Sequence, residues 1–278
     1  MAVERHPLSA PLALSQAEEY LAEQFAHLRW DTSRQPFQAW GRSYQNIFAV
    51  KPPSGGVTNE QIAPLIIGAH YDTVVGSPGA DDNASALAVL LEAASQLTSL
   101  PTSRPVWIAA FCLEEQGLLG SRAFVSKLKE SGQAIAGAIV LECVGYTNQI
   151  PGSQRIPSGV PMAVPTKGNF LGIIGNDASR GLMATIARNA QAINPPLPVL
   201  TLAVPAGGEH LPDVRRSDHA AFWDQGYPAV MLTDTANFRN PHYHQSTDTV
   251  ETLDLDFIEA VGETVVATVA ELARKTDL

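Results

Sequence analysis

Short apolar runs recur along the chain and give the first indication of its fold. They span residues 64–70, 105–114, 136–142, 170–175 and 228–233. Uninterrupted runs of this length are typical of strands that are buried on both faces of a sheet. Helical periodicity is found at residues 84–98, 117–131, 179–193 and 254–275. Alternating strands and helices predict an α/β fold, with a mostly parallel, mixed central sheet flanked by helices.

Two further patterns precede these runs. Residues Ser15 to Glu18 have the spacing of a capping box, and apolar residues then recur at about every third or fourth position to Leu28. This pattern predicts an N-terminal helix that begins near Ser15. Residues 39–51 alternate and are rich in aromatic and β-branched side chains, and prolines and glycines follow at 52–56. A strand that ends in a turn is expected there.

The length of 278 residues fits one large α/β domain or two small ones. Because the alternation of strands and helices is continuous, we expect one domain over residues 1–278. Residues 147–169 contain four prolines and three glycines, are too long for an ordinary connection and follow a predicted strand end. They are either a functional loop over a site or a surface insertion. We expect this loop to border the substrate pocket.

Charge and composition narrow the possible partners. The formal net charge is −10, from 18 basic and 28 acidic side chains. Nucleic acids and anionic membranes both favour clustered Lys and Arg, so neither is expected as a partner. No apolar run approaches the ~20 residues of a membrane-spanning helix, and the N-terminus resembles no secretion signal. With only two cysteines, a cytoplasmic location is expected. The oligomeric state stays open.

Polar residues gather at the ends of three predicted strands. His70 and Asp72 end one run, Glu114 and Glu115 end the next, and Glu142 ends the third. Ligands in open α/β sheets bind beyond the carboxyl ends of the strands, and neighbouring strands lie about 5 Å apart. These side chains could therefore converge on a pair of metal ions about 3.5–4 Å apart, with Asp72 accepting the second ring N–H of His70.

Each of these residues also has a simpler interpretation. His70 alone could be an ordinary buried histidine, and adjacent glutamates could be a solvated pair at a strand exit. Asp81 and Asp82 precede a predicted helix. They could bridge two cations or act as an N-cap. His244 could be an ordinary exposed loop histidine.

Six segments taken together resemble the M28 metallopeptidases, a family of zinc aminopeptidases to which glutaminyl cyclases are related. The segments are GAHYDT (68–73), GADDNAS (79–85), CLEEQGLLGS (112–121), LECVGY (141–146), RSDHAAFW (216–223) and PHYHQSTDT (241–249). They occur in the family's order over most of the chain. The resemblance implies the zinc-exopeptidase fold, which is phosphorylase/hydrolase-like.

The resemblance also implies roles for individual residues. Two zinc ions would be held by His70, Asp82, Glu115, Glu142 and His244, with Asp82, and not Asp81, as the bridging ligand. Glu114 would be the general base, and Asp72 would support His70. Many members have Asp at the position of Glu142. A cis peptide at Asp82–Asn83 is expected, because family members hold the bridging carboxylate in this way.

The remaining residues of these segments have less defined roles. Tyr243 matches a hydroxyl that polarises the scissile carbonyl in some members, or is a packed loop residue. Arg216 matches a substrate-contacting arginine, or is paired with a loop carboxylate. Asp218 and His219 would organise the site, and His242 would not be a ligand. The cysteines, Cys112 and Cys143, would be buried free thiols.

The function implied is that of a two-zinc exopeptidase that removes N-terminal residues from peptides. An acidic pocket around Glu114 and Glu142 would favour a positively charged N-terminus, so an aminopeptidase is expected. A glutaminyl cyclase-like acyltransferase with one zinc is the first alternative. A non-catalytic interaction domain of the same fold is the second.

Overall fold

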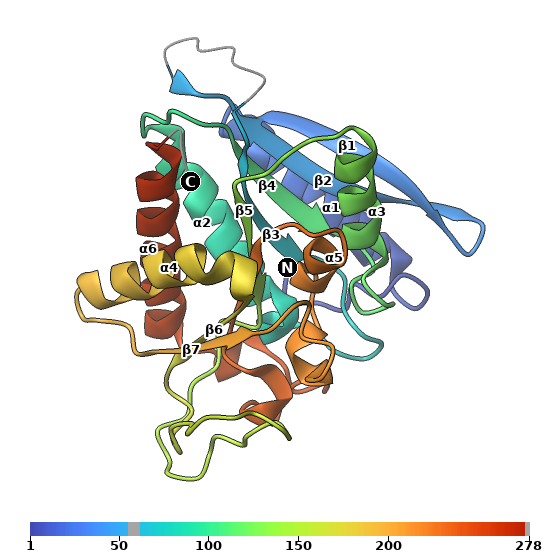
Figure 1. Cartoon of the computed structure of the whole chain (residues 1–278). Coiled ribbons are helices and arrows are strands. Elements are labelled where there is room, and N and C mark those ends of the chain that lie inside the picture. The colour runs from blue at the N-terminus through green and yellow to red at the C-terminus, as the bar shows by residue number, and fades with distance from the viewer. Residues whose placement is uncertain (55–61, 276–278) are drawn as a thin grey trace.

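An eight-stranded mixed sheet forms the centre of the protein in the computed structural model, which describes residues 1–54 and 62–275 (Figure 1). Its strands are β1 (Asp31–Ala39), β2 (Arg42–Lys51), β3 (Leu65–His70), β4 (Val106–Phe111), β5 (Gly137–Glu142), β6 (Leu171–Asn176), β7 (Val199–Val204) and β8 (Ala229–Thr233), in the order β1-β2-β4-β3-β5-β8-β6-β7. Strands β4, β3, β5 and β8 are parallel neighbours. Strands β2 and β6 run antiparallel to them on either side. The predicted mixed, mostly parallel sheet is confirmed.

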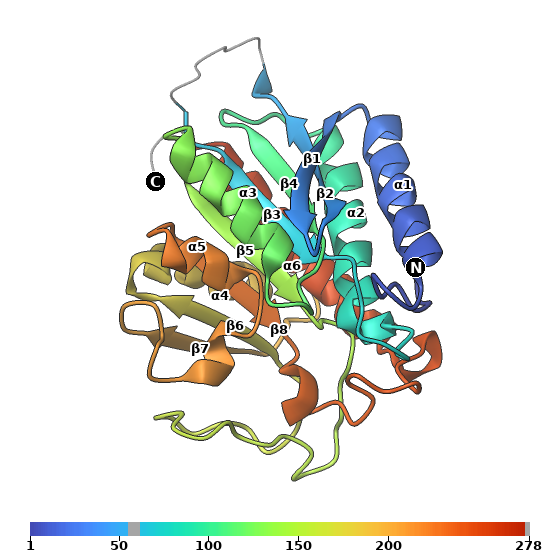
Figure 2. The same cartoon turned by 90° about the vertical axis from the view of Figure 1, so that its right-hand side faces the viewer.

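Helices cover both faces of the sheet (Figure 2). One layer contains α1 (Pro11–His27), α2 (Ala86–Thr98), α4 (Arg180–Ala192) and α6 (Leu255–Ala273), and the other contains α3 (Leu119–Glu130) and α5 (His219–Asp224). Short 3₁₀ turns lie in the connections: η3 (Asp177–Ser179), η4 (Pro212–Arg215), η5 (Ala236–Phe238) and η6 (Val250–Thr252). Among the described residues, no helix is long and apolar enough to cross a membrane.

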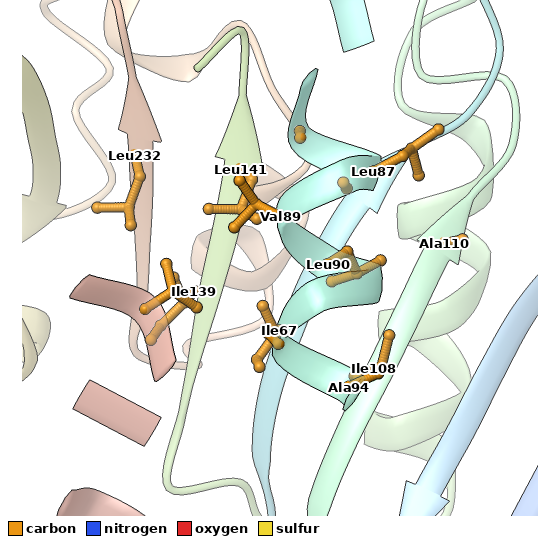
Figure 3. Close-up of a cluster of buried hydrophobic side chains, with 14 of the residues drawn as sticks. Ile67, Leu87, Val89, Leu90, Ala94, Ile108, Ala110, Ile139, Leu141 and Leu232 are labelled. Carbon is orange, nitrogen blue, oxygen red and sulfur yellow. The ribbon is translucent and has the colours of Figure 1, made fainter. Parts of the chain in front are cut away.

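Two apolar cores lie on the two faces of the central strands. Ile67 of β3 lies next to α2 and its Leu90, and Ile139 of β5 belongs to the same core (Figure 3). Their neighbours Ile66 and Val140 project to the opposite face and join the core beneath α3 and α5. Because every position of these strands is buried, their sequences are apolar without alternation. This is the physical reason that the sequence pattern predicts them.

The N-terminal part of the fold corrects two expectations. Helix α1 begins at Pro11, not near Ser15, and no side chain caps it; proline suits the first helical turn because its φ is fixed and its missing N–H would have no helical partner. The strand predicted at 39–51 is the second strand of a hairpin whose first strand is β1. Trp40 and Gly41, with φ of 49° and 71°, form the tight connection. The turn expected at 52–56 lies partly outside the described residues.

Truncating the core under α2 should destabilise the protein. Leu90 is fully buried, so Leu90→Ala is expected to lower the free energy of unfolding by about 2–5 kcal/mol through lost burial and a new cavity. Leu12→Ala is the matched control, because Leu12 also lies in a helix but is 72% exposed. Its effect should stay within about 0.5 kcal/mol. Urea denaturation measures both, and equal effects would contradict this description of the core.

Candidate metal centre

The polar residues singled out from the sequence lie at the carboxyl edge of the parallel strands. His70 and Glu142 are the last residues of β3 and β5, and both are buried. Glu114 and Glu115 follow the end of β4. Two connections complete the cluster: η2 (Ala80–Ser85), which precedes α2, carries Asp82, and the segment between η5 and η6 carries His244.

The two oxygens of the Asp82 carboxylate face two separate sets of donors. Asp82 Oδ1 lies 3.2 Å from His70 Nε2, which lies 3.4 Å from Glu142 Oε2. Asp82 Oδ2 lies 3.0 Å from His244 Nε2, which lies 3.2 Å from Glu115 Oε2. Each set therefore contains one imidazole, one carboxylate of its own and one oxygen of a shared carboxylate.

These donor sets fit zinc. Tetrahedral zinc with bonds of about 2.0–2.2 Å places its ligand atoms roughly 3.3–3.6 Å apart, close to the distances above. In the part of the chain that is described, His70 Nε2, both Asp82 oxygens, Glu115 Oε1 and His244 Nε2 are buried without a hydrogen-bond partner. Buried polar atoms normally have a partner, and cations in the two donor sets would supply one for this cluster.

The turn that carries Asp82 is held by two other segments. As expected, the peptide bond Asp82–Asn83 is cis. The Asp248 carboxylate accepts the backbone N–H of Asp82 at 3.2 Å. The Asn83 side chain accepts the backbone N–H of Cys143 at 3.0 Å, just beyond the end of β5. The position of the shared carboxylate is thus fixed from both sides.

Asp72 supports the site in a different way from the one expected. Nδ1 of His70 lies 3.2 Å from the backbone carbonyl oxygen of Asp72 and 3.7 Å from its carboxylate. The ring hydrogen bond is therefore made to the main chain. The Asp72 carboxylate instead accepts the backbone N–H groups of Glu114 at 3.0 Å and Glu115 at 3.3 Å. It holds the two glutamates in place because the ends of β3 and β4 are adjacent.

The electrostatics of the cluster favour positive charge. Burial raises the pKa of the Glu114 carboxyl well above its usual range and that of Glu115 to about 8. Burial opposes ionisation of Asp82 too, but contacts with His244 and His70 hold its pKa below the usual range. Burial likewise opposes the charge on His244, whose contacts with Asp82 and Glu115 raise its pKa to about 10. The ionised forms of Asp82 and His244 are each stabilised by the opposite charge beside them.

Tyr243 and Arg216 lie together next to the donor cluster. The Tyr243 ring stacks on the His244 ring at 3.8 Å between centroids. Arg216 Nη2 donates to the Tyr243 hydroxyl at 3.3 Å. Its Nη1 donates to Asn237 Oδ1 at 2.8 Å and lies 3.6 Å from Asp213 Oδ1. The pairing of Arg216 with a loop carboxylate, one of the two alternatives, is therefore present.

An apolar pocket of about 100 Å³ opens beside Glu142, Arg216 and Tyr243. Its apolar wall includes Val160, Met162, Val164, Phe170, Ile174, Leu200, Leu202 and Met231. Residues among 154–164, in the Pro- and Gly-rich loop, line this pocket beside the donor cluster. That the pocket binds the substrate stays a prediction. Strand β7, which the apolar pattern did not predict, supplies Leu200 and Leu202.

Several neighbours of the donor cluster complete its surroundings. Both cysteines are buried free thiols, as predicted, and Cys143 Sγ lies 3.5 Å from Glu142 Oε1. His242 bonds Thr247 at 2.9 Å and belongs to neither donor set. Ser217, which sequence reasoning did not single out, donates its hydroxyl to Glu142 Oε2 at 2.7 Å. Only its place in the segment 216–223 could have drawn attention to it.

The fold and the donor cluster define an α/β protein with a candidate two-metal centre at the carboxyl edge of its sheet. The family model described as peptidase family M28 matches residues 46–269. The chain is 31% identical to the uncharacterized protein YfbL of Escherichia coli over 94% of this chain and 82% of that protein. The chain belongs to peptidase family M28, a family of hydrolases.

Other relatives are named as aminopeptidases. Leucine aminopeptidase 1 of Trichophyton equinum is 27% identical over 76% of this chain, which spans 54% of that protein. Among solved structures, the zinc aminopeptidase BSAP of Bacillus subtilis has a TM-score of 0.65 at 27% identity, with 85% of this chain and 52% of that chain covered.

Two further solved structures share the fold at lower identity. LapA aminopeptidase of Legionella pneumophila has a TM-score of 0.74 at 22% identity, with 98% of this chain and 68% of that chain covered. Glutaminyl cyclase of Porphyromonas gingivalis has a TM-score of 0.71 at 20% identity, with 98% of this chain and 93% of that chain covered. At these identities the likeness establishes the fold alone.

His219, the buried first residue of α5, should make the free energy of unfolding depend on pH. Burial lowers its pKa to about 4, whereas an unfolded histidine has a pKa of about 6.5. Between these values the unfolded chain binds a proton that the folded protein does not, so acidification costs about 3 kcal/mol of unfolding free energy.

Urea denaturation at pH 7 and pH 4.5 tests this prediction. His219→Gln should show a smaller difference between the two pH values than the wild type. His27→Gln, at an exposed position of α1, should keep the wild-type difference. Equal pH dependence in both variants would contradict the prediction.

Proposed function

We propose that this protein is a two-zinc aminopeptidase, a hydrolase that removes N-terminal residues from peptides. One observation carries the proposal: the two oxygens of the buried Asp82 carboxylate each face a separate pair of histidine and glutamate side chains at zinc-ligand spacing. One zinc would be held by His70, Glu142 and Asp82, and the other by His244, Glu115 and Asp82. Zinc bound in this way polarises a carbonyl group and lowers the pKa of a water molecule.

In this proposal Glu114 is the group that moves the proton. A carboxylate oxygen of Glu114 lies within 4.8 Å of the ligand atoms of His70 and Glu142. Glu114 is nevertheless not needed as a ligand, because each zinc would already have three ligands from the protein. Burial raises the pKa of its carboxyl, which suits a residue that takes a proton from water and passes it to the leaving amine near neutral pH. The Asp72 carboxylate fixes its backbone. Tyr243 would donate its O–H to the carbonyl oxygen as negative charge develops there.

The shape and charge around the cluster support a peptide N-terminus as the group bound. Glu114 and Glu142 are both buried, and a protonated α-amino group would balance their negative charge. The adjoining pocket is walled by Met162, Phe170 and Leu202 among other apolar residues. An apolar N-terminal side chain fits such a pocket, because its burial is favourable by about 25 cal/mol per Å².

A glutaminyl cyclase-like activity with one zinc is the second candidate. The observation that favours it is that one donor set, His70, Glu142 and Asp82, contains three ligands and could hold a single zinc by itself. The second donor set, Glu115 and His244, argues for two ions, because a single zinc would leave its buried atoms without a partner.

Substitution of the adjacent glutamates should separate proton transfer from metal binding. Glu114→Gln has nearly the same shape but cannot accept the proton, so kcat for a leucyl anilide should fall by at least about 10²–10⁴ while zinc content stays at the wild-type level. Glu115→Ala removes a ligand and should lower zinc content. Metal analysis and activity are measured on the same samples. Loss of zinc from Glu114→Gln with retention in Glu115→Ala would reverse the two roles.

Metal titration should distinguish the candidate functions. The protein stripped with a chelator is expected to bind two equivalents of zinc. Saturation at 100 times Kd should stabilise it by about 2.7 kcal/mol for each site, a rise in Tm of roughly 5–10 °C per site. Both equivalents should be needed for hydrolysis of aminoacyl anilides. One equivalent together with cyclisation of N-terminal glutamine would favour the cyclase. No zinc binding at all would favour a non-catalytic domain.

A further inference from the structure

Arg5 is a buried cation directly behind the turn that carries Asp82. Its side chain is 0% exposed, and its guanidinium binds three carbonyl oxygens of the segment that follows β3. Nε donates to Tyr71 at 2.7 Å, Nη1 to Pro78 at 3.0 Å and Nη2 to Gly79 at 3.1 Å. The backbone N–H of Arg5 donates to Thr73 Oγ1 at 2.8 Å. A single side chain therefore joins the two ends of the segment 71–79.

These carbonyl groups lie in the main chain between two candidate metal ligands, His70 and Asp82. Tyr71 follows His70. The Gly79 carbonyl also accepts the N–H of Ala84 at 3.1 Å, the hydrogen bond that closes the turn around Asp82. Gly79 has φ of 61°, and a Cβ there would lie 2.3 Å from the Asp82 carbonyl oxygen. The main chain at Gly79 is therefore packed directly against the turn that carries Asp82.

The charge of Arg5 also suits this place. Burial lowers its pKa to about 10, so the guanidinium stays charged at neutral pH, and the carboxylates of Asp72, Asp82, Asp248 and Glu115 stabilise that charge. Removing this buried cation would take away the donors that bind the Tyr71, Pro78 and Gly79 carbonyl groups and the positive charge that offsets the nearby carboxylates. Arg5 lies outside residues 46–269, the range matched by the family model.

We infer that Arg5 is a positioning residue for the metal centre, which fixes the separation of His70 and Asp82 by binding the carbonyl groups of Tyr71 and Gly79. This inference rests on the proposed zinc-binding function. Arg5 needs no contact with the substrate, and its effect should appear first in the affinity for zinc.

The test measures zinc affinity and stability separately. Arg5→Met keeps an unbranched buried chain but removes the charge and all donors, and Arg5→Lys keeps the charge without the planar set of donors. The matched control is Arg104→Met. Arg104 is also buried, and it donates to the carbonyl groups of Lys275 at 2.8 Å and Ala63 at 3.2 Å, next to the amino ends of the strands. Competition with a coloured chelator gives the Kd for zinc, and thermal unfolding of the same samples gives Tm.

We expect Arg5→Met to bind zinc at least about 10-fold more weakly than the wild type, as when the outer partners of metal ligands are removed. Arg5→Lys should be intermediate, and Arg104→Met should lower Tm with wild-type zinc affinity. If Arg5→Met does not fold, the zinc affinity of folded Arg5→Lys is the test. Weaker binding than the wild type supports the inference, and wild-type affinity contradicts it.

Two results would overturn the inference while leaving the proposed function intact. One is wild-type zinc affinity in the folded Arg5 variants. The other is an equal loss of affinity in Arg104→Met, which would assign the effect to general destabilisation. Absence of zinc binding by the wild-type protein would instead refute the proposed function itself, and this inference with it.

Discussion

The burial of several carboxylates at one edge of the sheet is the constraint on which the rest of the structure depends. Asp72, Asp82, Glu114 and Glu142 are all at most 8% exposed. An ionised group withdrawn from water costs several kcal/mol unless opposite charge or hydrogen-bond donors lie beside it. Imidazole rings face Asp82, and backbone N–H groups face Asp72. The guanidinium of Arg5 lies behind the turn that carries Asp82. Metal ions would complete this balance.

The fold allows the carboxylates to meet because four neighbouring strands run in the same direction. Their carboxyl ends share one edge, where the exits of β4, β3 and β5 add donors at intervals of about 5 Å. The shared ligand comes from η2, just before α2, whose apolar face packs on β3 (Figure 3). Core packing therefore fixes the distance between Asp82 and the strand ends.

The sequence predicted the parts of this arrangement that have a local pattern. Central strands are buried on both faces and appear as apolar runs, whereas β7 is an edge strand of mostly half-buried residues and α5 has only six residues. Strand ends drew attention to His70 and Glu142. No local pattern could assign Asp82 over Asp81, for which the family resemblance was needed. Arg5 bonds to a residue 66 positions away, a relation that only the folded chain provides.

One arrangement of hydrogen bonds positions both pairs of adjacent acidic residues, Glu114 with Glu115 and Asp81 with Asp82. The Asp72 carboxylate accepts the N–H of Glu114 with one oxygen and that of Glu115 with the other. The Asp248 carboxylate does the same for Asp81 and Asp82. A dipeptide held by both of its N–H groups has a fixed backbone, so its two side chains can take different directions. Asp81 bonds Asn240 at 2.7 Å while Asp82 faces the histidines. Neighbouring residues of like charge can thus have separate roles because a third carboxylate orients the peptide groups between them.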